Sequence, residues 1–280
     1  MSHDTTPGPD GLRVIAVDMD GTFLGPGSEF DRHRFAPLRH RMRQKDVRFV
    51  VASGNQEAQL LAYFADETEG VELTPDGVVS DNGAVVLAGN QRLLETEMDG
   101  PALSHAVSFL DRVEGLSFIT SGPDGALMRD SEPEEMKQLL TFYHPQYRLV
   151  STAEEMKGTR VSKIALVDLD GFSPTFMRSL TEALGESIIP VGSGHESVDL
   201  IVPGRHKASG LDVLLRHWGV VPEQVAAFGD SDNDVEMLAH VGAGVAMAEA
   251  SERASSVAAL RAPSNASGGV LTVLESWYPA

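Results

Sequence analysis

The chain has 280 residues, of which 41 are acidic and 22 are basic, so its formal charge is −19 at pH 7; 42% of the residues are hydrophobic and none is cysteine. This composition excludes a disordered, collagen-like or coiled-coil chain, and the lack of cysteine excludes disulfides, thiolate zinc sites and thiol catalysis. So negative a charge argues against binding to nucleic acid or to an anionic membrane, and an anionic substrate would need a cation recruited to the site.

The N-terminal segment and the hydrophobic runs predict where the protein acts. Residues 1–11 include acidic, Pro and Gly residues but no apolar stretch, so we expect no secretory signal peptide. No apolar run approaches the roughly 20 residues that cross a bilayer. We therefore expect a cytoplasmic protein, and we expect it to be a monomer or a weak homodimer.

Short apolar runs alternate with helical patterns in the first third of the chain. Apolar residues two apart predict strands, whereas apolar residues three or four apart predict helices. The expected order is a strand at 13–17, a helix through Phe35, Leu38 and Met42, a strand at 49–52, a helix at 56–64 and a strand at 77–87. This β-α-β series is typical of a parallel sheet.

The pattern changes after residue 89 and returns after Pro203. The middle segment has hairpin-like strands and helices, at 102–113, 116–120, 125–129, 133–143, 160–167 and 198–202. Beyond Pro203, helices at 207–218 and 234–241 alternate with strands at 225–228 and 244–247. We therefore predict an α/β protein with a Rossmann-like parallel core, formed by residues 1–86 and 203–280 and interrupted by an inserted α+β unit at 87–202.

Two carboxylates follow the first predicted strand. Its apolar residues lead into Asp18 and Asp20, after which Gly21 allows a tight turn and Thr22 can hydrogen-bond locally. The carboxyl end of a central parallel strand is where open α/β sheets bind ligands. One carboxylate there can attack a substrate while the other transfers a proton. The alternative is an acidic loop that only caps a helix. It accounts less well for the apolar strand before the two carboxylates and the Gly-Thr pair after them.

A second acidic cluster follows the strand at 225–228. Asp230, Asp232 and Asp234 have the spacing of the first ligands of a calcium loop, but the positions that require Gly and Glu in such a loop both hold Val. Oxygen ligands at a strand end instead suit magnesium, which usually takes one or two carboxylates and keeps water or phosphate oxygens. Asp230 would complete such a site with Asp18.

Two weaker signals are suited to a phosphate group. Ser53 and Gly54 follow the strand at 49–52 and offer a hydroxyl and backbone N–H groups, although an isolated Ser-Gly pair is usually only a turn. Lys207, at the start of a predicted helix, offers a point charge for a phosphoryl oxygen, although an isolated lysine is usually a solvated surface residue. Their place at strand ends of one β-α series makes the phosphate interpretation the stronger one.

These signals, in this order, resemble the haloacid dehalogenase (HAD) phosphohydrolase superfamily. The four matching motifs are Asp18-Met-Asp-Gly-Thr22, Ser53, Lys207 and Gly229-Asp-Ser-Asp-Asn-Asp234. The insertion, preceded by Asp81-Asn-Gly-Ala84, looks like the type IIB cap of the Cof-type branch, and several motifs are similar to those of bacterial sugar phosphatases. The chain departs from the commoner Cof-type pattern at Asn55, where Arg often follows the Ser/Thr-Gly pair, so one cationic phosphate contact is not expected.

The resemblance implies a magnesium-dependent phosphatase that hydrolyses small phosphate monoesters, most of all sugar phosphates. Asp18 would be the nucleophile that forms an aspartyl-phosphate, and Asp20 would be the general acid and then the base. Mg²⁺ would be held by the Asp18 carboxylate, the Asp20 backbone carbonyl and Asp230.

The resemblance also implies roles for the remaining motif residues. Ser53, the Gly54 N–H and Lys207 would hold the transferring oxygens, and Asn233 would contact phosphate or a metal-bound water. Thr22 and Asp234 would support the site, the latter by orienting Lys207.

Two alternatives remain open. A sugar phosphomutase or phosphotransferase uses the same intermediate but withholds it from water. A signalling receiver also has a phosphorylated aspartate, but it needs neither the Asp-x-Asp-Gly-Thr motif nor an insertion.

We expect the inserted cap to select the substrate. His195 and Glu196, in a loop that begins at Gly192, would contact sugar hydroxyls, although a solvated hairpin turn is an equally good interpretation of this loop.

Overall fold

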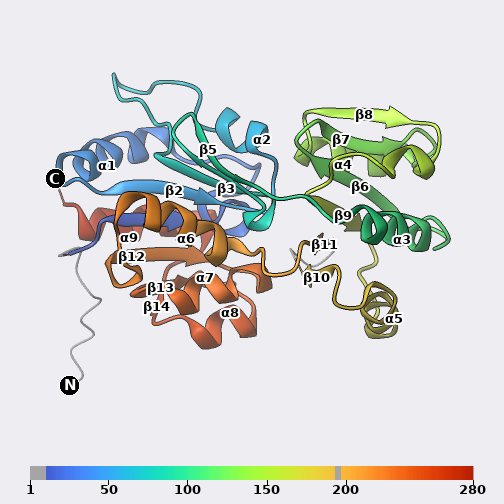
Figure 1. Cartoon of the computed structure of the whole chain (residues 1–280). Coiled ribbons are helices and arrows are strands. Elements are labelled where there is room, and N and C mark those ends of the chain that lie inside the picture. The colour runs from blue at the N-terminus through green and yellow to red at the C-terminus, as the bar shows by residue number, and fades with distance from the viewer. Residues whose placement is uncertain (1–10, 193–196, 280) are drawn as a thin grey trace.

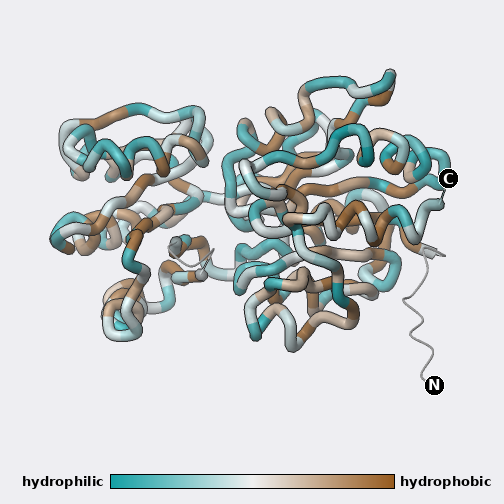
Figure 2. The backbone as a smooth tube through the Cα atoms, turned by 180° about the vertical axis from the view of Figure 1, so that it is seen from behind, coloured by the Kyte–Doolittle hydropathy of each residue, from teal (hydrophilic) through white to brown (hydrophobic). Residues whose placement is uncertain are grey.

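The structure, a computed structural model, describes residues 11–192 and 197–279. It contains two β-sheets that lie side by side, each with its own helices (Figure 1). In both halves, hydrophobic residues concentrate along the strands and hydrophilic residues along the outer loops and helix faces (Figure 2). Within the described ranges, no helix combines the length and the apolar character needed to span a membrane.

The larger sheet, which we call the core sheet, has eight strands in the order β14-β13-β12-β1-β2-β3-β4-β5. The strands from β14 to β3 are parallel, and β4 and β5 continue the sheet in antiparallel fashion. Their bounds are β1 Val14–Val17, β2 Arg48–Ala52, β3 Gly77–Ser80, β4 Val85–Ala88, β5 Gln91–Glu95, β12 Val225–Gly229, β13 Ala243–Ala246 and β14 Leu260–Arg261.

Helices cover both faces of the core sheet, so its central strands are buried on both sides and consist of continuous apolar runs. One face is covered by α1 (Arg32–Gln44), α2 (Glu57–Ala62) and α9 (Gly269–Trp277). The other face is covered by α6 (Lys207–Trp218), α7 (Val235–His240) and α8 (Glu252–Val257).

The strand predicted at 77–87 is wrong as one element, because the chain reverses at Asp81–Gly83 and forms β3 and β4. Asp81, Asn82 and Gly83 all have positive φ angles of 46°, 52° and 93°, which Asp, Asn and Gly tolerate better than other residues. The apolar residues on both sides of this turn are buried, so the run looks continuous in the sequence. The expected boundary at residue 87 therefore falls inside a strand of the core sheet.

The smaller sheet, with its helices, is formed by the chain from α3 to β11, and we call this unit the cap. Its strand order is β10-β11-β9-β6-β7-β8. The strands are β6 Ser117–Gly122, β7 Gly125–Arg129, β8 Tyr147–Val150, β9 Lys163–Val167, β10 Ile189–Gly192 and β11 Ser197–Ile201. Whether this unit folds by itself, as the predicted division at 87–202 implies, stays a prediction.

Helices cover the two faces of the cap sheet unequally. One face packs against α3 (Gly100–Leu110) and α5 (Pro174–Leu184). The opposite face packs against the single helix α4 (Glu134–Tyr143), which covers mainly β6 and β7. The remaining half of that face, on β9 and β11, is turned toward the core and lines a cavity.

Candidate active site

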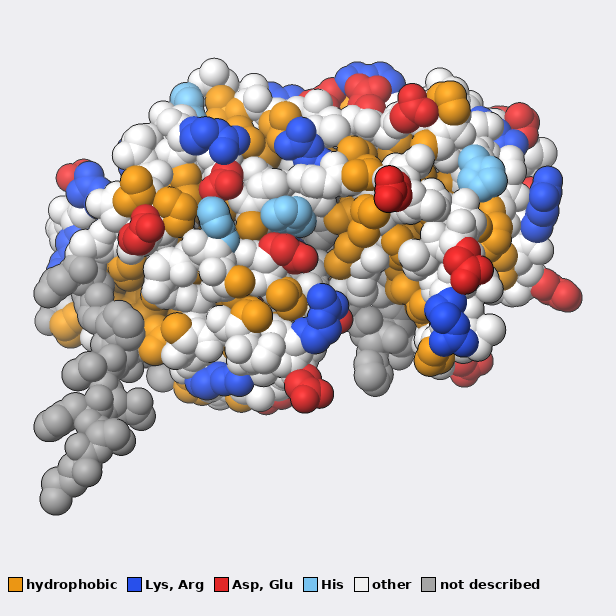
Figure 3. Space-filling view, turned by 60° about the horizontal axis from the view of Figure 1, so that its bottom comes forward, with side chains coloured by type: hydrophobic (Ala, Val, Ile, Leu, Met, Phe, Trp, Pro, Cys, Tyr) orange, Lys and Arg blue, Asp and Glu red, His pale blue; other side chains and the backbone are white. Residues whose placement is uncertain are grey.

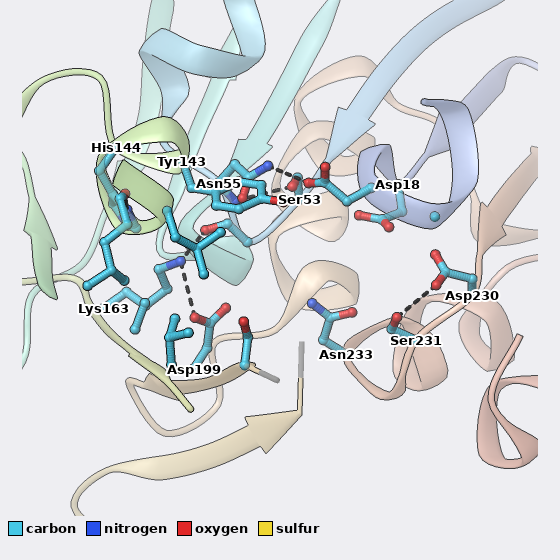
Figure 4. A pocket seen from close by; sticks show the side chains of 18 residues that line it. Asp18, Ser53, Asn55, Tyr143, His144, Lys163, Asp199, Asp230, Ser231 and Asn233 are labelled. Carbon is cyan, nitrogen blue, oxygen red and sulfur yellow. Dashed lines mark hydrogen bonds and ion pairs between the residues drawn. The ribbon is translucent and has the colours of Figure 1, made fainter. Parts of the chain in front are cut away.

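A cavity of about 400 Å³ lies between the carboxyl ends of the core strands and the half-covered face of the cap (Figure 4). Its core side includes Asp18 after β1, Ser53 after β2 and Asp230 after β12. Because these strands are parallel neighbours, residues far apart in the chain meet at one edge of the sheet. Most motif residues singled out from the sequence therefore lie at or beside one site.

Asp18 and Lys207 form the buried centre of the site. The Lys207 ammonium donates hydrogen bonds to Asp18 Oδ1 at 2.7 Å, to Asp234 Oδ1 at 2.7 Å and to Asn233 Oδ1 at 3.1 Å. Burial alone would lower the pKa of Lys207, but the two carboxylates outweigh burial and raise it. Burial, and then the nearby Asp234 carboxylate, raises the pKa of Asp18 well above its usual range. One lysine thus faces more negative charge than it can balance.

The turn after β1 joins the two acidic motifs. Gly21 has a φ of 77°, and a Cβ at this position would lie 2.5 Å from Asp230 Oδ2. Only glycine therefore lets the Asp230 carboxylate approach this closely. Thr22 donates a hydrogen bond to Asp230 Oδ1 at 2.6 Å, so the residue expected to support the site orients one of the expected metal ligands.

Asp20 points to the loop after β2 rather than to Asp18. Its Oδ2 accepts a hydrogen bond from Asn55 Nδ2 at 2.6 Å. Burial raises the pKa of Asp20, whereas the bond from Asn55 lowers it in part. A raised pKa suits a carboxylic acid that must hold a proton for a leaving group. The residue that departs from the commoner family pattern thus contacts the expected general acid.

Ser53 and Gly54 line the cavity next to Asn55. Ser53 is buried, and its hydroxyl accepts a hydrogen bond from the Asn55 N–H at 3.2 Å. The position of Ser53 and Gly54 suits the expected phosphate contacts, which stay a prediction.

Asn233 and Asp234 follow β12 in a single helical turn. Asp234 Oδ2 accepts hydrogen bonds from the N–H groups of Asp230 and Ser231, at 3.0 and 3.1 Å, while its Oδ1 accepts from Lys207. Asp234 therefore orients the lysine and fixes the turn that carries Asp230. Asn233 bonds to Lys207 through Oδ1 and to Asn82 Oδ1 through Nδ2, at 3.1 Å.

Three carboxylates could hold a metal ion, because oxygens of Asp18, Asp230 and Asp234 lie within 4.8 Å of one another. Asp18 and Asp230 line the cavity, whereas Asp234 does not, and both Asp234 oxygens accept hydrogen bonds from Lys207 and the backbone. Asp18 and Asp230 are therefore the better ligands, as expected from the sequence. Burial and then Asp234 raise the pKa of Asp230, which indicates uncompensated negative charge. This oxygen donor set fits a hard divalent cation such as Mg²⁺.

The cap adds two charged residues that the sequence did not single out. Lys163 and Asp199, from the neighbouring strands β9 and β11, are 3% exposed and line the cavity (Figure 4). Lys163 Nζ donates to the Gly54 carbonyl at 2.5 Å and lies 3.2 Å from Asp199 Oδ1. Asn82 Nδ2 donates to Asp199 Oδ2 at 2.6 Å. These bonds, continued through Asn233, link the cap to Lys207.

A signal for these residues exists in the sequence, because one charge stands at the start of an apolar strand run and the other stands inside one. Lys163 begins the run Lys-Ile-Ala-Leu-Val, and Asp199 lies inside Val-Asp-Leu-Ile. A buried charge needs a partner, so such positions are candidates for a site. The expected selector residues His195 and Glu196 lie outside the described residues.

Comparisons with known proteins agree with this geometry. Residues 15–274 match the family model of the haloacid dehalogenase-like hydrolases. The chain is 33% identical over 264 residues to the 5-amino-6-(5-phospho-D-ribitylamino)uracil phosphatase YbjI of Escherichia coli, over 94% of this chain and 95% of that protein. It is similar in structure to SMU.1108c from Streptococcus mutans, with a TM-score of 0.87, 29% identity and coverage of 96% and 100%. The HAD subclass IIB sugar phosphatase BT4131 shares the fold, with a TM-score of 0.82, 19% identity and coverage of 95% and 99%.

Proposed function

The chain belongs to the haloacid dehalogenase-like hydrolase family and is a phosphatase of small phosphate substrates, and we propose that these substrates are sugar or polyol phosphates, hydrolysed with Mg²⁺ through an aspartyl-phosphate on Asp18. The observation that carries the proposal is the pairing of Asp18 with the buried Lys207 ammonium, 2.7 Å away, beside an Asp20 that is held by Asn55. This arrangement supplies a nucleophile, a fixed cation and a proton donor in one cavity.

Two displacements at phosphorus complete the proposed reaction. An oxygen of Asp18 attacks phosphorus, the ester P–O bond breaks, and the proton of Asp20 moves to the departing alkoxide. Asp20, now ionised, takes a proton from water as that water attacks phosphorus and breaks the bond to Asp18. Both aspartates return to their starting states, and inorganic phosphate leaves.

Asp18 and Asp230 would hold the Mg²⁺, together with the Asp20 carbonyl expected from the family. When bound, the ion would neutralise charge so that an anionic carboxylate can approach an anionic phosphate. Lys207 balances only part of the charge of Asp18, Asp230 and Asp234, which supports the need for a second cation.

A small metabolite suits this molecule better than a macromolecular substrate. The site is a cavity rather than a long groove, and its size is in the range of roughly 300 to 1,000 Å³ that is usual for small ligands. On the face shown in Figure 3, Lys and Arg side chains are scattered among acidic ones and form no continuous basic patch. The relative YbjI is named for a phosphorylated ribityl compound, which supports a sugar or polyol phosphate. Cytoplasmic location, and a monomer or weak homodimer, remain part of the proposal.

A metabolite screen tests the proposal. The purified protein is incubated with phosphorylated sugars and polyols, and released phosphate is measured with Mg²⁺, with excess chelator, and after Mg²⁺ is restored. We expect turnover only with Mg²⁺, and poor turnover with Ca²⁺, whose larger and looser coordination misplaces the reacting groups. Full activity in excess chelator would contradict the metal requirement.

The same incubation separates the two rival functions. A phosphomutase would produce an isomeric sugar phosphate instead of inorganic phosphate. A receiver would give a stable phosphoprotein without turnover.

A further inference from the structure

Resting on the proposed phosphatase function, we propose that Asn82 is a positioning residue of the reaction: through its side-chain amide, Asp199 of the cap orients Asn233, which is expected to contact phosphate. Asp199 and Asn233 line the cavity from the cap and from the core, as Figure 4 shows, whereas Asn82 does not line it. Asn82 would therefore act through Asn233 and not by contact with the substrate.

Four buried side chains form one chain of hydrogen bonds from the core to the cap. Lys207 Nζ donates to Asn233 Oδ1 at 3.1 Å, and Asn233 Nδ2 donates to Asn82 Oδ1 at 3.1 Å. Asn82 Nδ2 then donates to Asp199 Oδ2 at 2.6 Å. Every bond points the same way, from the ammonium toward the carboxylate, so each bond polarises and strengthens the next.

The chemistry of the two ends fixes the orientation of both amides. An ammonium can only donate, so Asn233 must turn its oxygen to Lys207. Asp199 is paired with Lys163 at 3.2 Å, and because a carboxylate can only accept, Asn82 must turn its nitrogen to it. Between these ends, a flip of either amide would bring two donors or two acceptors together. Asp199 therefore decides which atom Asn82 offers to Asn233.

The amide of Asn233 is held at both of its polar atoms, by Lys207 at Oδ1 and by Asn82 at Nδ2. Nδ2 uses one of its two N–H groups on Asn82, so the other can donate to a phosphate oxygen in the cavity. Lys207 alone would leave the amide free to tilt about its Oδ1 contact. Removal of the Asn82 amide should therefore misplace this N–H and loosen one of the three bonds that hold the lysine.

The backbone of the turn presents the Asn82 amide to the cap. Asn82 has a φ of 52°, a left-handed conformation that Asn adopts more readily than most residues, and its N–H donates to the Ser53 carbonyl at 3.1 Å. Gly54 leaves room for the bond between Asn82 and Asp199, since a Cβ there would lie 2.8 Å from Asp199 Oδ2 and 3.2 Å from Asn82 Nδ2. A variant that changes only the side chain at position 82 therefore tests the chain of bonds.

Asn82→Gly removes the amide and keeps the left-handed backbone, which glycine adopts freely. We expect kcat to fall by roughly tenfold or more, both for the best sugar phosphate of the metabolite screen and for 4-nitrophenyl phosphate. The two losses should be similar, because both substrates place the same phosphoryl group beside Asn233. A loss confined to the sugar phosphate would mean that Asn82 serves the leaving group, and it would overturn the inference.

Asp46→Gly is the matched control for the backbone. Asp46 also has a left-handed φ, of 55°, but it is exposed in the turn before β2, at the end of that strand opposite Ser53. This variant should hydrolyse both substrates as the native protein does. Urea denaturation shows that each assayed variant is folded. Unchanged kcat in folded Asn82→Gly would overturn the inference.

An exchange of the two partners tests the direction of the bond and does not require Asn82→Gly to fold. Asn82→Asp places a carboxylate against Asp199, and Asp199→Asn alone lets Lys163 hold the new oxygen, so that two amide nitrogens meet farther along the chain. Each single variant should lose roughly tenfold in kcat for 4-nitrophenyl phosphate. Together, the new amide at position 199 can donate to the new carboxylate, which still accepts from Asn233.

The double variant should therefore recover kcat to within about threefold of the native value, a coupling that independent sites do not show. Losses that multiply in the double variant would overturn the inference and leave the phosphatase function intact. Failure of the native protein to hydrolyse both the sugar phosphates and 4-nitrophenyl phosphate would instead overturn the proposed function itself.

Discussion

Asn55 donates a hydrogen bond from its side-chain amide to Oδ2 of Asp20 over 2.6 Å, so the loop after β2 holds the carboxylate that follows β1. The bond joins two parallel strands at the edge of the sheet where the cavity opens. Asn55 therefore has a role that differs from the phosphate contact expected of Arg at this position. In the proposed reaction, it would fix the direction in which Asp20 presents its proton.

The first prediction concerns this bond. Asn55→Ala should lower kcat/KM for a sugar phosphate by roughly tenfold to a hundredfold, because a hydrogen bond to a charged group contributes about 1.5–3 kcal/mol. The loss should be much smaller for 4-nitrophenyl phosphate, whose leaving group needs no proton. Phosphate release from both substrates gives the comparison. Equal losses would show that Asn55 acts elsewhere in the reaction.

The second prediction concerns the nucleophile. Asp18→Asn should stop turnover, with a loss of at least roughly 10⁴-fold, because the amide cannot form the acyl-phosphate. Labelled substrate followed by an acid quench should leave phosphate on the native protein and none on the variant. The fold should persist, since an Asn Oδ1 can still accept from Lys207. A phosphorylated variant would refute the assignment.

The third prediction concerns Thr22, which holds an oxygen of Asp230. Thr22→Val keeps the shape of the side chain but removes this 2.6 Å bond. We expect the Mg²⁺ concentration for half-maximal activity to rise roughly tenfold, as is usual when a group that orients a metal ligand is lost. Thr68→Val is a matched control, because Thr68 is similarly buried but lies away from the site. A titration that does not differ from the native one would argue that Asp230 holds no metal.

The fourth prediction concerns stability and Asp81. Burial raises the pKa of this carboxyl to about 6, so between about pH 4 and pH 6 the folded protein keeps a proton that the unfolded chain has lost. The free energy of unfolding therefore falls as pH rises through this range, by up to about 3 kcal/mol from this group. Asp81→Asn keeps an acceptor for the Ser121 hydroxyl but has no charge to bury.

Urea denaturation of both proteins between pH 4 and pH 7 checks this sign. The variant should gain stability relative to the native protein as pH rises to about 6, and the difference should then level off. A difference that stays constant or shrinks would mean that the Asp81 pKa is not raised.

Much of the core and the site could be predicted from the sequence. The family and the α/β class are confirmed by the comparisons. Asp18, Ser53 and Asp230 could be found because each directly follows a buried strand, and parallel strands bring their carboxyl ends together. Local hydrophobic patterns were enough to find these three residues, because the parallel arrangement of the strands places their carboxyl ends at one edge of the sheet.

The cap contribution could not be predicted in the same way. Lys163 and Asp199 reach the site only because β9 and β11 dock against the core, and strand patterns do not report how two sheets meet. Asn82 was also missed, because its position depends on a turn hidden between two buried apolar runs. The short strands β5, β8 and β10 were missed for a different reason, because nearly all of their residues are exposed or only half-buried and they mix polar with apolar side chains.

The central place of β1 in the core sheet affects how the protein is made. Its partner β2 leaves the ribosome soon after it, but its other partner, β12, begins only at Val225. During most of synthesis one edge of β1 is therefore unpaired, and such an edge can template aggregation. Nascent chains should depend on holding chaperones until β12, which begins at Val225, has emerged. For the same reason no nascent chain that ends before Asp230 can contain a complete site, because Asp18 meets Lys207 and Asp230 only after both have been synthesised.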